Sequence, residues 1–255
     1  MELFVRKDSV VREIWGNADV ILFIFAGASA EFALNKAVDW LYYTGKLPSD
    51  PIGRLFSTVE YARLIVFSNK KEAVAAIEKI TAIHQTLEQN RGFKIPDWAY
   101  RDVLFMLIDY SIRSFELLAR KLTYSEKQEV FEVFLKVGQG MNLIGLPQNF
   151  KDWIEMRESH LENDLQKSEF TIDLFKQYKK HLGFIRYKIL LESQILVLPQ
   201  KVKYKLNYGN HSWLKFILSV YKFSKFLSLD KFMRFVILPS KYFKQIEELN
   251  IHQKN

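Results

Sequence analysis

The chain has 255 residues, of which 49% are hydrophobic and 15% aromatic, so it can bury a substantial core. It contains no cysteine, which excludes disulfides, iron–sulfur clusters, thiolate metal sites and a cysteine nucleophile. The net charge of +8 comes from the C-terminal third, because residues 1–166 hold 20 basic and 23 acidic side chains whereas residues 167–255 hold 17 and 6.

The hydrophobic pattern predicts helices along nearly the whole chain. Asp8 or Ser9 can cap a short first helix that Gly16 ends, and a buried segment is expected at 18–43. The longest apolar run within it has 11 residues, too few for the ~20 that cross a bilayer as a helix. Residues 1–12 carry charges of both signs instead of the apolar stretch of a signal peptide, so we expect a cytoplasmic bacterial protein.

Further helices are predicted at 52–67, 69–87, 98–118, 123–137 and 150–165. Thr123 with Glu126 has the spacing of a capping box at the start of one of them. Three or four shorter helices follow, and 201–205 is the one stretch with the alternation of a strand. We therefore predict an all-α protein with one domain at 1–240, basic helices at 167–240, and a terminal helix or tail at 241–255.

Arg54 and Thr58 lie four residues apart, so on a helix they share one face, which Tyr61 extends. A buried arginine needs an anion beside it, because an unpaired buried charge costs several kcal/mol. A carboxylate of the fold would serve, as would the propionate or phosphate of a ligand. The alternative is an arginine at the surface or at a helix end, which needs no such partner.

His84 follows Ile77 and Ile80 at spacings of three and four residues, and Leu87 continues the series. This pattern predicts that its side chain points into the core. A buried neutral imidazole needs a partner for each ring nitrogen. A metal ion or heme iron would use one nitrogen while a carbonyl or carboxylate orients the other. The alternative is a core histidine bonded only to protein groups.

The other four histidines give weaker signals. His160 and His181 lie among charged residues and are expected in solvent, His211 lies in a turn, and His252 is near the C-terminus. No two histidines have metal-ligand spacing, and HExxH, Walker A, GxGxxG and GxSxG motifs are absent. The absence of these motifs argues against three classes of protein: zinc hydrolases, P-loop enzymes and α/β-hydrolases.

Basic and aromatic residues are interleaved in the C-terminal third, for example in KVKYKLNYGNHSWLKFILSVYKFSKF at 201–226. Such a mixture can bind nucleic acid by charge and stacking, or it can lie on an anionic membrane surface. It can also place lysines on the solvent face of helices whose aromatic face packs on the domain. We favour this last interpretation, then peripheral membrane contact; nucleic acid has the least support.

Three segments, in this order, resemble the oxygenase family that includes rubber oxygenase (latex clearing protein) and the MpaB-type oxygenases. The first is REIWGNADVILFIFAGASAEFAL, with a Trp-Gly pair before an apolar helix. The second is RLFSTVEYARLIVFSNKKEAVAAIEKITAIHQTL, which contains Arg-x-x-x-Thr and a helix with Ile-His. The third is LTYSEKQEVFEVFLKVGQGMNLIGLP with its Gly-Leu-Pro turn, and two later Leu-Pro pairs also fit.

The resemblance implies an all-α fold, heme b as the cofactor and His84 as an axial iron ligand. It also places Arg54 and Thr58 near the heme, in cofactor-binding and catalytic roles. The arginine would then find its anion in a heme propionate or in bound oxygen, and the threonine hydroxyl would bond the same group. The chain departs from some rubber-cleaving members at Ser57, where they have lysine, and Asp39 is the one candidate for their acidic base.

Two hypotheses follow for the function. In the first, the protein is a heme-dependent oxygenase that acts on a hydrophobic small molecule, such as a lipid or an isoprenoid. In the second, it is a non-catalytic helical binding protein that uses an apolar pocket or its basic face. Polyisoprene is not expected as the substrate without a secretion signal, and the sequence predicts no oligomeric state.

Overall fold

The structure is a computed structural model that describes residues 2–43, 45 and 49–218. These residues contain ten complete α-helices and no strand, with two isolated β-bridges, Leu3 to Asn69 and Asn35 to Leu165. The predicted all-α fold is confirmed for this part of the chain. The predicted boundary at residue 240, the second Leu-Pro pair and His252 lie outside the described residues.

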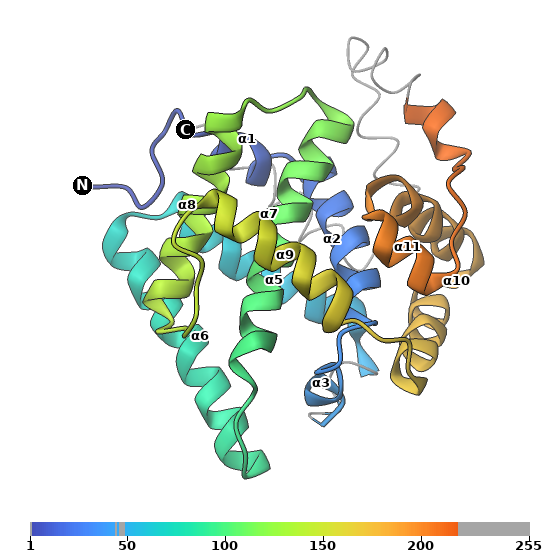
Figure 1. Cartoon of the computed structure of the whole chain (residues 1–255), viewed down its shortest axis with the longest axis horizontal. Helices are drawn as coiled ribbons and strands as arrows, with labels where there is room; N and C mark the ends of the chain where they lie inside the picture. The colour runs from blue at the N-terminus through green and yellow to red at the C-terminus, as the bar shows by residue number, and fades with distance from the viewer. Residues whose placement is uncertain (1, 44, 46–48, 219–255) are drawn as a thin grey trace.

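The helices are α1 (Val10–Trp15), α2 (Ala18–Phe32), α3 (Asp39–Tyr43), α5 (Pro51–Phe67), α6 (Lys70–Arg91), α7 (Asp97–Leu118), α8 (Tyr124–Gly140), α9 (Phe150–Asn163), α10 (Glu169–Val197) and α11 (Gln200–Leu206). α7 runs through the middle of the molecule and packs against α2, α8 and α9, while α5 and α6 pack on each other (Figure 1). Among the helices described, none is both long and apolar enough to span a membrane.

The structure divides the segment at 18–43 and corrects the prediction at 201–205. In the first, α2 ends at Phe32 and a turn follows in which Asn35 Oδ1 accepts a hydrogen bond from Ala37 N at 2.8 Å. The stretch at 201–205 is helical and belongs to α11. Val202 and Leu206, four residues apart, form its buried face, so helical spacing outweighs the alternation of lysines.

α2 and α7 pack closely because α2 carries a glycine at their contact. A methyl group at position 27 would lie 2.3 Å from Cδ1 of the Tyr110 ring. Tyr110 is fully buried, and so is Ile24, one turn before Gly27 on α2. Gly27 therefore sets the distance between α2 and α7, the two helices that form the centre of the core.

The capping box predicted at α8 is present. Thr123 Oγ1 accepts a hydrogen bond from Glu126 N at 3.2 Å, and the Glu126 carboxylate accepts one from Thr123 N at 2.8 Å. We expect Thr123→Ala to lower the free energy of unfolding by about 1 kcal/mol in urea denaturation, since α8 loses a cap. Ser125→Ala, on the exposed side of the same first turn, is the control. Equal unfolding midpoints for both variants would show that the cap contributes nothing.

Candidate functional site

A cavity lies between α5, α6, α7 and α8. Its interior measures about 190 Å³, and with the open space at its mouth it reaches about 1020 Å³. Most of its lining is apolar, with Ile65, Val103 and Phe134 as examples from three helices. The polar side chains in its lining are those of Arg54, Thr58, Tyr61, His84 and Tyr100. The structure thus brings together at one cavity the three residues to which the sequence assigns a site.

α5 contributes Arg54, Thr58 and Tyr61, which share one face as their spacing predicts. The Arg54 guanidinium donates a hydrogen bond to Ser57 Oγ at 3.0 Å, and Thr58 Oγ1 donates one to Arg54 O at 3.3 Å. In the described part of the chain, no carboxylate forms an ion pair with Arg54. Burial lowers the pKa of Arg54, and the charge of Tyr61 opposes this shift. Arg54 therefore offers a cation to whatever occupies the cavity.

His84 lies on α6 and lines the same cavity. Its Nδ1 is buried and has no hydrogen-bond partner among the described residues. Burial, assisted by the charge of Arg54 and opposed by Glu88, lowers the pKa of His84 to about 4, so the imidazole is neutral at pH 7. The predicted face is only partly buried, because Ile77 is buried whereas Ile80 and His84 are half-buried beside the cavity.

Tyr100 of α7 holds the His84 ring from one side. The two rings meet edge to face with their centres 5.1 Å apart. The Tyr100 hydroxyl donates to Glu88 Oε1 at 3.0 Å, and the same oxygen accepts a hydrogen bond from Ile95 N at 2.9 Å. Glu88 lies one turn after His84 on α6, so this contact ties α6 to α7 at the level of the imidazole. The ring of His84 is therefore oriented by packing, and its nitrogens stay available.

Asp39, the candidate acidic base, does not line this cavity. Its carboxylate is engaged with Arg91 Nη2 at 2.7 Å, on the far end of α6. A second cavity, of about 110 Å³ and largely apolar, lies between α2, α5 and α10 and holds none of the predicted site residues.

A buried polar cluster that was not predicted from the sequence is formed by α2, α7 and α9. His160, expected in solvent, is only 2% exposed, so that prediction is wrong. Arg157 and Glu31, at 3% and 0% exposure, lie beside it. Acidic residues inside otherwise apolar helices, such as Glu31 and Asp109, were the signal that could have revealed the cluster.

Arg157 connects the three helices of this cluster. Its guanidinium donates to both carboxylate oxygens of Glu31 and, at 2.9 Å, to Asp109 Oδ2. Tyr110 also donates its hydroxyl to Glu31, at 2.7 Å. Burial raises the pKa of Glu31, but Arg157 and then His160 outweigh it and lower the pKa to about 2. Burial lowers the pKa of His160, and its contacts with Asp102 and Glu31 raise it to about 9.

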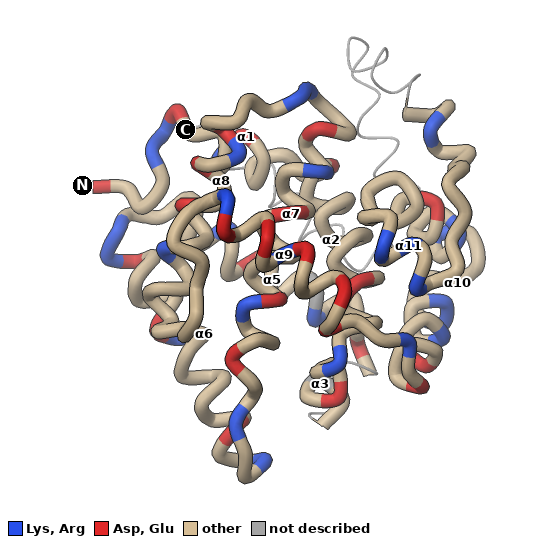
Figure 2. The backbone as a smooth tube through the Cα atoms, in the orientation of Figure 1, with Lys and Arg blue, Asp and Glu red and all other residues tan. Residues whose placement is uncertain are grey.

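Lys and Arg occur along α10 and α11, where the sequence is most basic (Figure 2). Lys201 forms ion pairs with Glu158 and Glu162 of α9, at 3.2 and 2.9 Å, and Lys203 is 9% exposed. These two lysines of α11 are therefore engaged with the domain itself. Peripheral membrane contact stays a prediction, and much of the basic segment lies outside the described residues.

One comparison with known proteins gives a match. Residues 14–215 match the family model described as "ER-bound oxygenase mpaB/B'/Rubber oxygenase, catalytic domain". No curated protein and no solved structure matches the chain. The matched range includes α2 and α5–α11, and therefore both the cavity and the buried polar cluster.

Proposed function

The chain belongs to the family of the ER-bound oxygenase mpaB/B' and rubber oxygenase catalytic domains, and on this basis we propose that it is a heme b-dependent oxygenase. The cavity between α5, α6, α7 and α8 would hold the cofactor, and His84 would ligate its iron. The single observation that carries this proposal is the His84 imidazole, which is neutral, borders the cavity and has a buried Nδ1 without a partner.

An unpartnered buried nitrogen is unusual, because buried polar atoms almost always form a hydrogen bond. Iron ligation requires a neutral imidazole, and the lowered pKa of His84 supplies it at pH 7 without loss of a proton. The edge-to-face contact with Tyr100 would keep the ring in place before the cofactor binds. The donor and its surroundings therefore fit an iron ligand.

Arg54 would hold the cofactor by charge. It is half-buried, lines the cavity and forms no ion pair with a described carboxylate. A heme propionate would supply the anion for an ion pair with its guanidinium. Thr58, one turn further along α5, presents a hydroxyl to the same space. Because the interior is smaller than a typical ligand pocket of about 300–1000 Å³, a group as large as heme would also fill the mouth.

Heme, when bound, supplies an iron centre that activates dioxygen. The protein's own residues would orient the cofactor and bring a substrate to it. The aliphatic and aromatic walls, with Val103 of α7 and Phe134 of α8, exclude water and fit a hydrophobic substrate. We propose a lipid- or isoprenoid-like small molecule as that substrate.

The test is titration of the purified full chain with hemin, followed by its absorption spectrum. We expect one equivalent to bind with a sharp Soret band, and His84→Ala to lose that band or weaken binding at least about tenfold. Arg54→Met should weaken binding and leave the ligated spectrum in place, because Arg54 would hold a propionate and would not ligate the iron. His181→Ala, a half-buried histidine on α10 outside the cavity, is the matched control.

Two results would overturn the proposal. One is a folded protein, judged by circular dichroism, that fails to bind hemin. The other is a His84→Ala variant whose heme spectrum equals that of the wild type. Either would leave the cavity as a binding site for a hydrophobic molecule without heme chemistry.

A further inference from the structure

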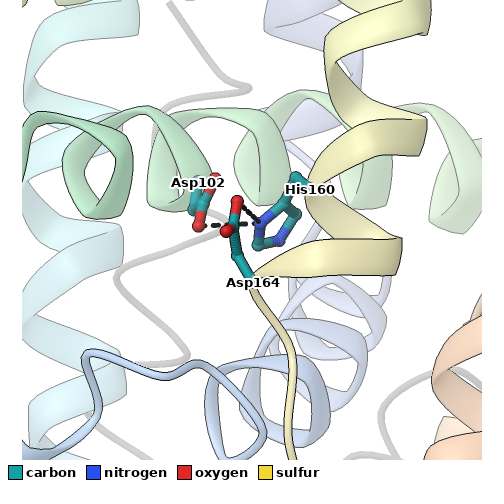
Figure 3. Close-up of side chains that lie close together, drawn as sticks. All are labelled: Asp102, His160 and Asp164. Carbon is teal, nitrogen blue, oxygen red and sulfur yellow. Dashed lines mark ion pairs between the residues drawn. The ribbon is translucent and has the colours of Figure 1, made fainter.

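One nitrogen of the His160 ring in the buried cluster forms ion pairs but no well-directed hydrogen bond. Nε2 lies 2.9 Å from Glu31 Oε1 in a hydrogen bond. Nδ1 is buried and lies 2.7 Å from Asp102 Oδ2 and 3.5 Å from Asp164 Oδ2, yet it forms no hydrogen bond. The Asp102 oxygen is close enough but lies off the direction in which the ring N–H would point. The three side chains face one another from α7 and the end of α9 (Figure 3).

Such an arrangement is typical of ligands that share an ion. Ligands about 2.1 Å from a metal lie roughly 3 Å from one another, and a nitrogen lone pair then points at the ion and not at the neighbouring ligand. The distances from His160 Nδ1 to Asp102 Oδ2, 2.7 Å, and to Asp164 Oδ2, 3.5 Å, fall on either side of this value. We propose that His160, Asp102 and Asp164 bind a divalent transition-metal ion, such as Zn²⁺ or Mn²⁺. One imidazole and two carboxylates suit these ions better than Ca²⁺ or Cu⁺.

The residues behind His160 have the arrangement of an outer ligand shell. A histidine that binds a metal usually donates its other N–H to a carboxylate, which fixes the tautomer. Here Glu31 accepts from Nε2 and is itself held by Arg157 and Tyr110. This leaves Nδ1 to face the two aspartates. Of the six supporting and ligating residues, all but Asp164 are almost completely buried, so the geometry is fixed before an ion arrives.

Charge and access agree with this assignment. Asp102 is 2% exposed, and its buried carboxylate would face the cation directly. The side chain of Asp164 is 30% exposed and gives the ion a path from solvent. On binding, the ion would replace the proton of Nδ1.

The ion would support the wall of the cavity without entering it. Asp102 lies on α7 between Tyr100 and Val103, both of which line the cavity, while its own side chain faces α9. A bond from α7 through the ion to the end of α9 would therefore fix the segment of α7 that positions Tyr100 against His84.

The test uses the full chain, stripped with a chelator and dialysed, in calorimetric titrations with ZnCl₂ and separately with MnCl₂. We expect one equivalent to bind at the cluster, and Asp164→Asn to weaken binding at least about tenfold while the protein stays folded. Glu162→Gln, on the exposed side of α9, removes the same charge and should bind as the wild type does. His84→Ala should retain this binding, which separates the cluster from the heme ligand.

A second readout is the melting temperature, which should rise with ZnCl₂ in the wild type and in Glu162→Gln, and by clearly less in Asp164→Asn at the same ZnCl₂ concentration. Absence of a stoichiometric Zn²⁺ or Mn²⁺ site in the wild type would overturn the proposal. So would equal affinity in Asp164→Asn and the wild type. In that case His160 is an imidazolium held between Glu31 and Asp102, with a purely structural role. Hemin binding is measured separately, so failure here leaves the proposed function standing.

Discussion

Arg157→Met is expected to remove about 3–5 kcal/mol from the free energy of unfolding. The guanidinium is 3% exposed and neutralises Glu31 while it also bonds Asp109. Methionine fills most of the volume but donates no hydrogen bond, so Glu31 would keep a buried charge with fewer partners. Because domains are stable by only about 5–15 kcal/mol, this loss would be a large share of the total stability.

Urea denaturation followed by circular dichroism measures this loss. Arg113→Met is the matched control, since Arg113 also pairs with Asp109, at 2.7 Å, but its side chain is 40% exposed. An exposed pair contributes less than about 1 kcal/mol. The double variant Arg157→Met with Glu31→Gln should recover part of the stability, because both charges are then gone. Equal losses in Arg157→Met and Arg113→Met would contradict the buried-charge explanation.

The elements and residues that depend on local spacing could be predicted from the sequence. The helical periods of 52–67 and 98–118 agree with α5 and α7 within a residue or so, and the capping box starts α8. Arg54, Thr58 and Tyr61 share a face for the same reason, since their order on a helix follows from 3.6 residues per turn. That His84 lies at the same cavity as these residues was expected from the family resemblance, because spacing alone does not show which helices pack together.

The buried cluster could not be predicted because its pairs are distant in sequence. Glu31 and Arg157 belong to α2 and α9, and although Glu31 stands out in its apolar helix, Arg157 looks like a surface charge in its own segment. His160 lies in RESHLEND, where charged neighbours suggest solvent, yet the face that it shares with Trp153 and Arg157 points inward. Only the packing of α9 on α7 shows which of these polar residues are buried.

The cluster and the cavity are coupled through α7. Tyr100, Val103 and Leu107 line the cavity, whereas Asp102 and Asp109 reach the cluster. The ion pairs therefore fix the rotation of α7 about its axis, and with it the position of Tyr100 against His84. A fold that held α7 by apolar contacts alone would allow it more rotation, since such contacts are less directional than hydrogen bonds.

Gly27→Ala is expected to lower the free energy of unfolding by about 1–3 kcal/mol, although alanine is the better helix former. The new methyl group would lie 2.3 Å from Cδ1 of a fully buried Tyr110, so α2 and α7 would have to separate. Glu31 lies one turn beyond Gly27 on α2 and accepts a hydrogen bond from Tyr110, so the displacement would also stretch the cluster. Gly209→Ala is the control, because a methyl group there meets no atom within 4 Å.

The losses of stability caused by Gly27→Ala and Arg157→Met should therefore be non-additive. If Gly27→Ala already moves Glu31 away from its partners, Arg157→Met has less left to remove, and the double variant should lose less stability than the two single losses combined. Urea denaturation of the four proteins gives this coupling directly. Strict additivity would mean that the contact of α2 with Tyr110 and the ion pairs of Glu31 act independently. The close packing of α2 on α7 would then not position the cluster.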